Sequence, residues 1–303
     1  MKIAIIIKTF SIDKGGVERY AVNLSSALLC EGHEVHIFAS RWDTSKDSNS
    51  ELVHTGIKLH HVPMGRGPRV LKLILFHLAC QRQLRKEKFD IVHALTQTCP
   101  ADIYRMSDGL FRHWLVTKYP NPMYRLFFCL LRPVLIFNLI LEKRIFRPGG
   151  CRYLIANSNL CRQQAESYYS VHPERIEVIY NGVDLDTFNR GAKAFRSKIR
   201  KSYNVPEDAP LLLFISMNFA RKGLSELIRS LPLVRASFPG LRLMVVGKGD
   251  PGPYRRAAGV LGVEEALVFA GPAKETAPFY GAADLFVLPT HYDPFANVCL
   301  EAM

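Results

Sequence analysis

Apolar positions near the start of the chain form two kinds of pattern. Residues 2–7 and 34–39 are mostly apolar runs of strand length. Between them, over 17–31, apolar residues recur at the three- and four-residue spacing of an amphipathic helix, and Gly32 follows. Strand, helix, glycine stop and strand in this order predict a βαβ unit of a parallel sheet.

The same alternation continues along the rest of the chain. In the first half we predict strands at 57–62 and 89–94 and a helix over 70–86. After Arg190 the pattern starts again, with one helix over 223–238 and strands at 211–215, 241–246, 267–269 and 284–288. The sequence therefore predicts an α/β fold with two doubly wound parallel sheets.

The length of the chain agrees with two domains. It has 303 residues, which is long for one ordinary domain. Asn181-Gly182-Val183-Asp184 contains an Asn-Gly turn that suits a domain junction. We predict Rossmann-like domains over 1–180 and 190–303, with ligands at the carboxyl ends of their strands.

Two carboxylates lie eight residues apart near the end of the sequence. Asp293-Pro294 predicts a helix start, because Asp is a good N-cap and Pro suits the first turn. The amides of 295–298 would then lack intrahelical acceptors and would bind a phosphate. Glu301, roughly 10 Å further along, would accept hydrogen bonds from hydroxyls of the same ligand. The alternative is that Asp293 only caps the helix and Glu301 is only a solvated residue.

Charge and cysteine content limit the kinds of partner and binding site that we expect. The formal net charge of +13 favours an anionic partner, which is nucleic acid, anionic lipid or a phosphorylated substrate. Seven cysteines without a CxxC pair argue against a disulfide framework or a zinc site, and for a reducing compartment. We expect no metal. Residues 124–141 are the longest apolar stretch, but charged residues interrupt it, so we predict no transmembrane helix.

Residues 111–147 combine arginine, lysine, aromatic and leucine residues. This composition predicts a surface that lies on an anionic bilayer without crossing it. The alternative is a pair of core-facing helices with a solvated basic side. Because no RNA- or DNA-binding module is recognisable, we predict no nucleic-acid partner.

Several motifs occur in one order along the chain. They are Gly15-Gly16-Val17-Glu18-Arg19, Asn181-Gly182-Val183-Asp184, Arg221-Lys222-Gly223, the run from Ala283 to Pro289, and the run from Asp293 to Glu301. In this order they resemble the retaining GT-B glycosyltransferases of family 4, and among these the bacterial lipopolysaccharide core glucosyltransferases. Residues 142–146 and 172–176 also look similar, so the resemblance spans nearly the whole chain.

The resemblance implies a GT-B fold of two Rossmann-like domains, the second apparently truncated at its C-terminal end. It implies transfer of a hexose, with retention, from a nucleoside diphosphate sugar to a cell-envelope glycan or a lipid-linked acceptor. A UDP-sugar is the expected donor, bound mainly by the second domain, and the acceptor is expected mainly in the first. The expected location is cytoplasmic, peripheral on the inner face of the cytoplasmic membrane.

The same resemblance assigns residues to the donor. Arg221 and Lys222 match the basic pair that contacts the donor phosphates, where a fixed cation pair stabilises a leaving diphosphate. Glu301 would bind the ribose. Asp293 would bind hydroxyls of the sugar. It stands where relatives usually carry Glu, so the identity of the donor sugar is not predicted. Gly16 matches a loop glycine whose backbone approaches the donor.

Three further assignments complete the prediction. The amides of Asn297 and Val298 belong to the predicted phosphate site. Asp102 resembles an aspartate near the acceptor. Many relatives carry a histidine two residues after the position of His93, where this chain has Leu95, so His93 is expected to be a strand-end residue.

Other functions remain as alternatives. Residues 247–252 fit G-x-G-x-x-G, but Pro251 and Pro253 would disturb the helix start that a dinucleotide needs. A truncated, non-catalytic sugar-nucleotide binder and a nucleotide-sugar epimerase on the same fold are the two alternatives to a transferase.

Overall fold

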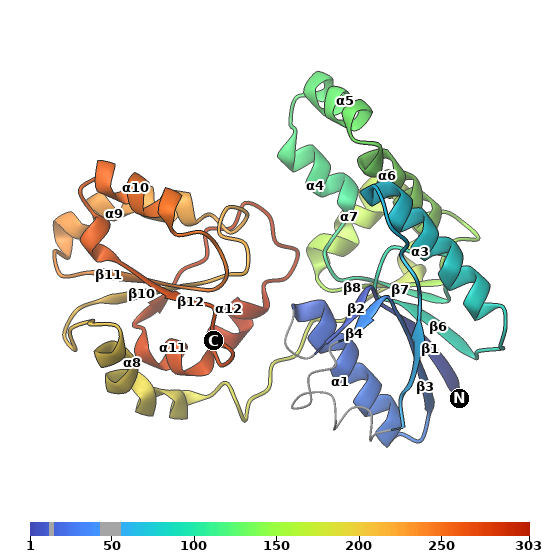
Figure 1. The fold of residues 1–303 in the computed structure, drawn as a ribbon, viewed down its shortest axis with the longest axis horizontal. Coiled ribbons are helices and arrows are strands. Elements are labelled where there is room, and N and C mark those ends of the chain that lie inside the picture. The colour runs from blue at the N-terminus through green and yellow to red at the C-terminus, as the bar shows by residue number, and fades with distance from the viewer. Residues whose placement is uncertain (12–14, 43–55) are drawn as a thin grey trace. The chain divides into compact units, whose positions relative to one another are not determined.

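The computed structural model describes residues 1–11, 15–42 and 56–303 (Figure 1). The described chain divides into two compact units, Met1–Asn181 and Gly182–Met303. The sequence predicts domains over 1–180 and 190–303, so the observed division falls within the predicted Asn-Gly junction.

The first unit is built on a seven-stranded sheet in which every pairing is parallel. Its strand order is β5-β3-β1-β6-β7-β8-β9, so the order reverses direction beside β1. The strands are β1 (Lys2–Ile6), β3 (Glu34–Ala39), β5 (Lys58–His61), β6 (Ile91–Ala94), β7 (Ile103–Met106), β8 (Tyr153–Ala156) and β9 (Ile176–Val178). Two short strands, β2 (Thr9–Phe10) and β4 (Arg41–Trp42), pair separately. A reversal of strand order is where doubly wound sheets leave a crevice at their carboxyl ends.

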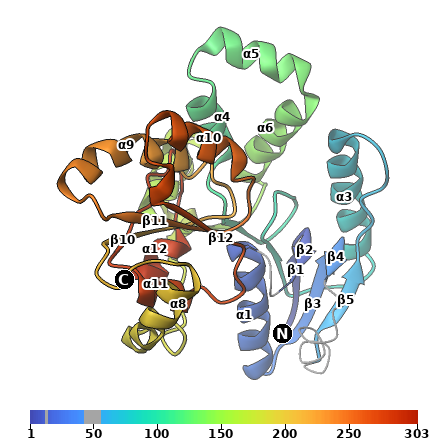
Figure 2. The same ribbon diagram turned by 60° about the vertical axis from the view of Figure 1, so that its left-hand side comes forward.

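Helices cover both faces of this sheet (Figures 1 and 2). They are α1 (Gly16–Cys30), α3 (Arg69–Leu84), α4 (Phe111–Lys118), α5 (Pro122–Leu131), α6 (Pro133–Phe146) and α7 (Asn159–Tyr169). Alternate residues of β1 separate the two layers: Ile3 and Ile5 pack in the cluster that holds α1, and Ala4 and Ile6 pack with Phe76 of α3. This alternation makes β1 a strand buried on both faces, as its continuous apolar run predicts.

The second unit repeats the plan around a four-stranded parallel sheet of order β12-β11-β10-β13. Its strands are β10 (Leu211–Ile215), β11 (Arg242–Val246), β12 (Leu267–Gly271) and β13 (Leu285–Phe286). Its helices are α8 (Arg196–Ser202), α9 (Leu224–Ser237), α10 (Gly252–Val260), α11 (Ala277–Ala282) and α12 (Asn297–Ala302). Three 3₁₀ turns, Pro173–Arg175, Arg190–Phe195 and Glu264–Ala266, complete the described elements of the two units.

Two predicted features near the end of the chain differ from the structure. The strand predicted over 284–288 shortens to Leu285–Phe286. Asp284 instead forms ion pairs of 2.8 Å with Arg196 and Arg200, and its Oδ2 accepts a hydrogen bond from the Leu211 amide. A carboxylate with these partners anchors the start of β13 to α8 and to β10. The other difference is the helix predicted to start at Asp293, which begins at Asn297.

The basic, aromatic segment 111–147 forms the three helices α4, α5 and α6. Within the described residues, no single helix is long and apolar enough to cross a bilayer. Taken together, α5 and α6 meet the length and composition of a span, but they meet at a bend of 105°.

Candidate functional site

Loops from three strands meet at the carboxyl edge of the four-stranded sheet. They follow β10, β11 and β13, and two glycines let their backbones approach closely. Gly223 has φ +80°, and a Cβ there would overlap the carbonyl oxygen of Pro289. Gly247 has φ +133°, and a Cβ there would overlap the carbonyl oxygen of Ser216. Side chains other than hydrogen are therefore excluded at both positions, and the three loops form one packed layer.

Lys222 and Asp293 form an ion pair within this layer. The Lys222 Nζ contacts the Asp293 Oδ2, and the two side chains are 11% and 10% exposed. The other carboxylate oxygen, Asp293 Oδ1, accepts a hydrogen bond of 3.2 Å from the Phe295 amide. The structure therefore brings together the residue predicted for the donor phosphates and the residue predicted for the donor sugar.

Arg221 precedes this lysine and is exposed. Its amide donates to Asn218 Oδ1 at 3.1 Å, and its carbonyl accepts from the His291 amide at 3.2 Å. The Thr290 hydroxyl donates to the same carbonyl at 3.3 Å. These contacts hold the backbone of the β10 loop against the β13 loop and leave the guanidinium at the surface of the site.

The helix that follows does not begin at Asp293. Helix α12 begins at Asn297, and its N-cap is Ala296, which makes no side-chain cap bond. The prediction of an Asp293 cap is wrong because that carboxylate is turned to Lys222 and closes a local turn with Phe295 instead. Asn297 and Val298 are therefore the first two residues of α12.

Glu301 lies on α12 beside a residue that the sequence analysis missed. The Tyr280 hydroxyl of α11 lies 3.0 Å from both the Glu301 Oε2 and the Val298 carbonyl oxygen. Burial, followed by the negative charge of Glu301, raises the pKa of Tyr280. The phenol therefore stays protonated and can donate to the carboxylate.

Cys299 lies on the same short helix. Burial raises the pKa of the Cys299 thiol, and the charge of Lys222 partly offsets the rise. This places α12 close to the ion pair. The carboxyl edge of the four-stranded sheet thus gathers Lys222, Asp293, Asn297, Val298 and Glu301, with Arg221 at its surface.

The carboxyl edge of the seven-stranded sheet holds a second polar group. Arg105 of β7 is 1% exposed; its Nη2 donates to the Ile179 carbonyl at 3.0 Å and to Asn181 Oδ1 at 2.7 Å. Its guanidinium carbon lies 4.1 Å from the Tyr20 ring centroid. Among the described residues, neither Arg105 Nη1 nor His93 Nε2 has a hydrogen-bond partner, although both atoms are buried.

His93 is a residue of β6, one position from the end of the strand, as expected. Burial, with a smaller effect of Arg105, lowers the pKa of His93 to about 4. At neutral pH the imidazole is therefore neutral and can accept or donate one further hydrogen bond. Lys8, just after β1, is a further polar residue that the sequence analysis missed; burial lowers its pKa, and Asp108 partly offsets this.

Gly16 is the first residue of α1, and it is exposed. It follows Gly15, the N-cap, whose backbone is extended. Residues 12–14 of the same loop lie outside the described residues. The structure therefore shows Gly16 at the N-terminus of a helix after β1, and the predicted approach to a donor remains a prediction.

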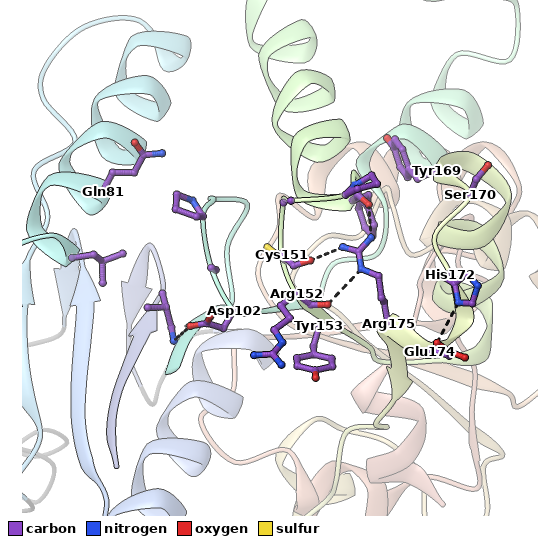
Figure 3. Close-up of a pocket in the computed structure, with 18 of the residues that line it drawn as sticks. Gln81, Asp102, Cys151, Arg152, Tyr153, Tyr169, Ser170, His172, Glu174 and Arg175 are labelled. Carbon is purple, nitrogen blue, oxygen red and sulfur yellow. Dashed lines mark hydrogen bonds and ion pairs between the residues drawn. The ribbon is translucent and has the colours of Figure 1, made fainter. Parts of the chain in front are cut away.

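Asp102 lies at the other edge of its sheet. It directly precedes β7, and its Oδ2 accepts a hydrogen bond of 2.8 Å from the Val92 amide of β6 (Figure 3). Doubly wound sheets bind substrates at the carboxyl ends of the strands, and Asp102 is at the amino ends. This position argues against the predicted role of Asp102 near the reacting atoms of the acceptor.

Comparisons with known proteins agree with the motifs. The profile of Glycosyltransferase Family 4 matches residues 14–187, and that of Glycosyl transferases group 1 matches 209–303. The chain belongs to glycosyltransferase family 4. It is an enzyme of the glycosyltransferase type, with the GT-B fold that the sequence predicts.

Two curated relatives show the range of the family. The lipopolysaccharide glucosyltransferase WaaG of Escherichia coli K12 is 25% identical over 295 residues, which cover 95% of this chain and 74% of that protein. A D-inositol 3-phosphate glycosyltransferase of Thermomonospora curvata is 25% identical over 326 residues, 96% of this chain and 73% of that protein.

Solved structures show the same architecture. The crystal structure of WaaG superimposes with a TM-score of 0.84 at 22% identity, covering 99% of this chain and 78% of that one. The structure of Anabaena Alr3699/HepE in complex with UDP has a TM-score of 0.71 at 18% identity, covering 100% and 78%. At these identities the likeness establishes the fold of the two units.

Proposed function

We propose that this glycosyltransferase moves a hexose from a UDP-sugar, with retention, to a cell-envelope glycan or lipid-linked acceptor. The curated relative from Escherichia coli is a lipopolysaccharide glucosyltransferase, and Anabaena HepE has been solved with UDP and glucose. The HepE complex supports a UDP-hexose as donor, and the name of the Escherichia coli relative supports a glycan as acceptor. The observation on which the proposal rests is the Lys222–Asp293 ion pair at the carboxyl edge of the second unit's sheet.

This pair gives both halves of a sugar nucleotide a partner. A lysine ammonium has three donors, and a carboxylate has two acceptor oxygens. When a donor binds, Lys222 turns toward the diphosphate and Asp293 toward sugar hydroxyls. As the bond to the anomeric carbon breaks, negative charge grows on the diphosphate, and a cation held in a poorly solvated loop stabilises that charge. No protein nucleophile is assigned.

Neighbouring groups complete the donor site. The exposed Arg221 guanidinium adds a second cation for the diphosphate, and it is suited to bidentate contacts with phosphate oxygens. Glu301, oriented by the Tyr280 hydroxyl at 3.0 Å, accepts hydrogen bonds from the ribose. The amides of Asn297 and Val298 add further donors, and the role of Gly16 of the first unit is proposed from its motif alone. With two cations for the diphosphate, we propose that no metal ion is needed.

The acceptor side of the proposal concerns a membrane surface. Six large apolar side chains of α5 are more than half exposed: Met123, Tyr124, Leu126, Phe127, Leu130 and Leu131. A soluble helix normally buries such a face, so these exposed residues favour a membrane-facing surface over the core-facing alternative.

Basic residues lie around the same helices. Arg132 lies over the Phe128 ring at 5.6 Å, and Lys118 lies over the Trp114 ring at 4.9 Å. Lys143 and Arg144 of α6 are exposed. Cations beside an apolar face bind the headgroups of anionic lipids. We propose that α5 and α6 hold the enzyme on the cytoplasmic face of the membrane, where it meets a lipid-linked acceptor.

One assay tests the enzymatic proposal. Purified protein is incubated with radiolabelled UDP-glucose and other UDP-sugars, with and without a lipid-linked core oligosaccharide, and the linkage in the product is determined by NMR. The proposal expects acceptor-dependent transfer with retained configuration, unaffected by EDTA. It also expects that Arg221→Ala combined with Lys222→Ala lowers donor affinity. Donor isomerised without acceptor would indicate an epimerase, and binding without any turnover would indicate the non-catalytic alternative.

A further inference from the structure

A large cavity opens at the amino edge of the seven-stranded sheet. Its volume is about 1120 Å³, and all the residues that line it belong to the first unit (Figure 3). The C-terminal ends of α3, α6 and α7 surround it, together with residues just before β7, β8 and β9. This is the opposite edge from the one where doubly wound sheets bind their substrates. The cavity therefore lies outside the site proposed above.

Much of the wall is apolar. The hydrophobic lining residues are Leu84, Val92, Pro100, Ala101, Phe146, Pro148, Tyr153 and Tyr169. Small-molecule sites typically have volumes of roughly 300–1,000 Å³, apolar walls and a few polar groups that fix orientation. This cavity has that composition and is large enough for a ring system or a short acyl chain.

Two arginines supply positive charge at the cavity. Arg85 follows the last turn of α3, and Arg152 precedes β8; both are exposed. The Arg152 guanidinium carbon lies 5.2 Å from the Tyr153 ring centroid. Within residues 1–11, 15–42 and 56–303, no ion pair joins either arginine to a carboxylate. Both guanidinium groups can therefore bind an anion from outside.

The third arginine of the wall has a structural role. Arg175 donates to the carbonyl oxygens of Phe146 at 3.2 Å and Arg152 at 3.5 Å, and also to that of Cys151 (Figure 3). These acceptors include the end of α6, where carbonyls lack intrahelical partners. Arg175 therefore fixes the shape of the cavity wall, and its N–H donors are largely used by the protein itself.

The acidic residues of the wall already have partners. Asp102 accepts from the Val92 amide at 2.8 Å, and Glu174 lies 3.7 Å from His172 Nδ1. Each carboxylate therefore has one local donor, and with three arginines against two carboxylates the lining carries a net positive charge. The cavity combines an apolar wall with a cationic rim.

We propose that this cavity binds a small amphipathic anion, with an apolar ring or acyl body against the wall and a phosphate or carboxylate at Arg85 and Arg152. Neither the apolar wall nor the arginines alone would select such a ligand. Together, the wall and the arginines favour an amphipathic anion over a neutral apolar molecule, which gains no ion pair. They also favour it over inorganic phosphate, which leaves the apolar wall exposed to water.

A fluorescence titration with 1-anilinonaphthalene-8-sulfonate, an aromatic sulfonate, tests the proposal on the full chain. Because the exposed face of α5 can also bind this dye, all titrations use a background with Leu126→Glu and Leu130→Glu. We expect one saturable site. We expect Arg85→Glu with Arg152→Glu to weaken dye binding at least tenfold. Tyr153→Ala, which changes no charge, should weaken it severalfold.

The matched control is Arg69→Glu. Arg69 is an exposed residue at the first turn of α3, and Arg85 lies at the other end of the same helix. Arg69→Glu makes the same charge change as Arg85→Glu alone, about 24 Å from Arg85 along the helix, so it should leave dye binding unchanged. Equal affinity for the dye in the Arg69→Glu variant and in the variant with both Arg85→Glu and Arg152→Glu would overturn the proposal.

Competition distinguishes the two kinds of ligand. Displacement of the dye by 1-naphthyl phosphate supports a ring-bearing anion, and displacement by octyl phosphate supports an acyl anion. Displacement by inorganic phosphate at the same concentration would show that charge alone is recognised, and would overturn the amphipathic proposal. Failure of all three to displace the dye would overturn it as well. None of these outcomes depends on glycosyl transfer.

Discussion

The carboxyl edges of the two sheets differ in how their polar groups are satisfied. In the second unit, Lys222 pairs with Asp293, and Tyr280 hydrogen-bonds to Glu301. In the first unit, His93 and Arg105 each bury a nitrogen that lacks a partner among the described residues. The second unit thus holds charged groups in pairs that a ligand can exchange, whereas the first holds a neutral imidazole and one open guanidinium donor.

The difference has an energetic reason. A paired lysine and carboxylate can stay charged at about one-tenth exposure, because each offsets the desolvation of the other. An imidazole without an anionic partner stays neutral, and its pKa falls. We infer that the second unit supplies the charge for the reaction.

The largest expected effect comes from removing the cation of the pair. Lys222→Met keeps the apolar stem, leaves Asp293 without its partner and removes the charge that stabilises the diphosphate. We expect kcat/KM for glycosyl transfer to fall by about 10²–10³-fold. The control is Lys201→Met, which removes an exposed lysine of the same unit and should change kcat/KM less than twofold. A loss below tenfold for Lys222→Met would contradict the assignment.

The loop packing that holds this pair can be tested through stability. Gly223→Ala places a methyl group against the Pro289 carbonyl at a positive φ. We expect the free energy of unfolding in urea to fall by roughly 2–4 kcal/mol. Gly240→Ala is the matched control, because a Cβ there meets nothing within 4 Å, and its effect should stay below about 1 kcal/mol. Equal effects of the two substitutions would show that the loops are not tightly packed.

The neutral histidine of the first unit predicts a dependence of stability on pH. The pKa of folded His93 is about 4, below the ordinary value near 6.5. Between these values the unfolded chain binds a proton that the folded chain does not, so stability is lost as the pH falls from about 6.5 to 4.

The size of this loss follows from the pKa shift, and it is roughly 3 kcal/mol. His93→Gln should remove that part of the slope, as measured by urea unfolding at a series of pH values. An unchanged slope between pH 6.5 and 4 in the variant would mean that His93 titrates normally.

The smallest expected effect concerns the orientation of Glu301. Tyr280→Phe keeps the ring of α11 and removes the hydroxyl that lies 3.0 Å from the Glu301 carboxylate. We expect affinity for UDP to fall about fivefold, the value of roughly one hydrogen bond. Tyr254→Phe, on α10, serves as the control. An unchanged dissociation constant for UDP in the Tyr280 variant would remove this tyrosine from the donor site.

Much of the fold can be predicted from the sequence where strands are mostly apolar runs. β3 and β10 match their predicted ranges, and β1 and α9 differ by a residue or two at an end. The sequence analysis missed β7, β8 and β9, which are only three or four residues long. In β7 the pattern is also broken by Arg105, a buried arginine whose partners come from the distant residues 179 and 181.

In the candidate site, too, some residues could be predicted from the sequence and others could not. Lys222 and Asp293 could be singled out because each lies in a recognisable motif, and the structure places them in contact. Tyr280 could not, because a single tyrosine on a helix gives no indication that it will meet Glu301. The start of α12 was predicted wrongly, since the preference of Asp for an N-cap gives way to a stronger contact with Lys222. Local propensity does not include such partners from distant loops.

Calorimetric titration of UDP and of UDP-glucose into Lys222→Met and Asp293→Asn tests the central claim most directly. If Lys222 binds the diphosphate, its substitution weakens both ligands about tenfold or more. If Asp293 binds the sugar, Asp293→Asn weakens UDP-glucose clearly more than UDP. The account would be contradicted if Lys222→Met left UDP binding intact, or if Asp293→Asn affected the two ligands equally.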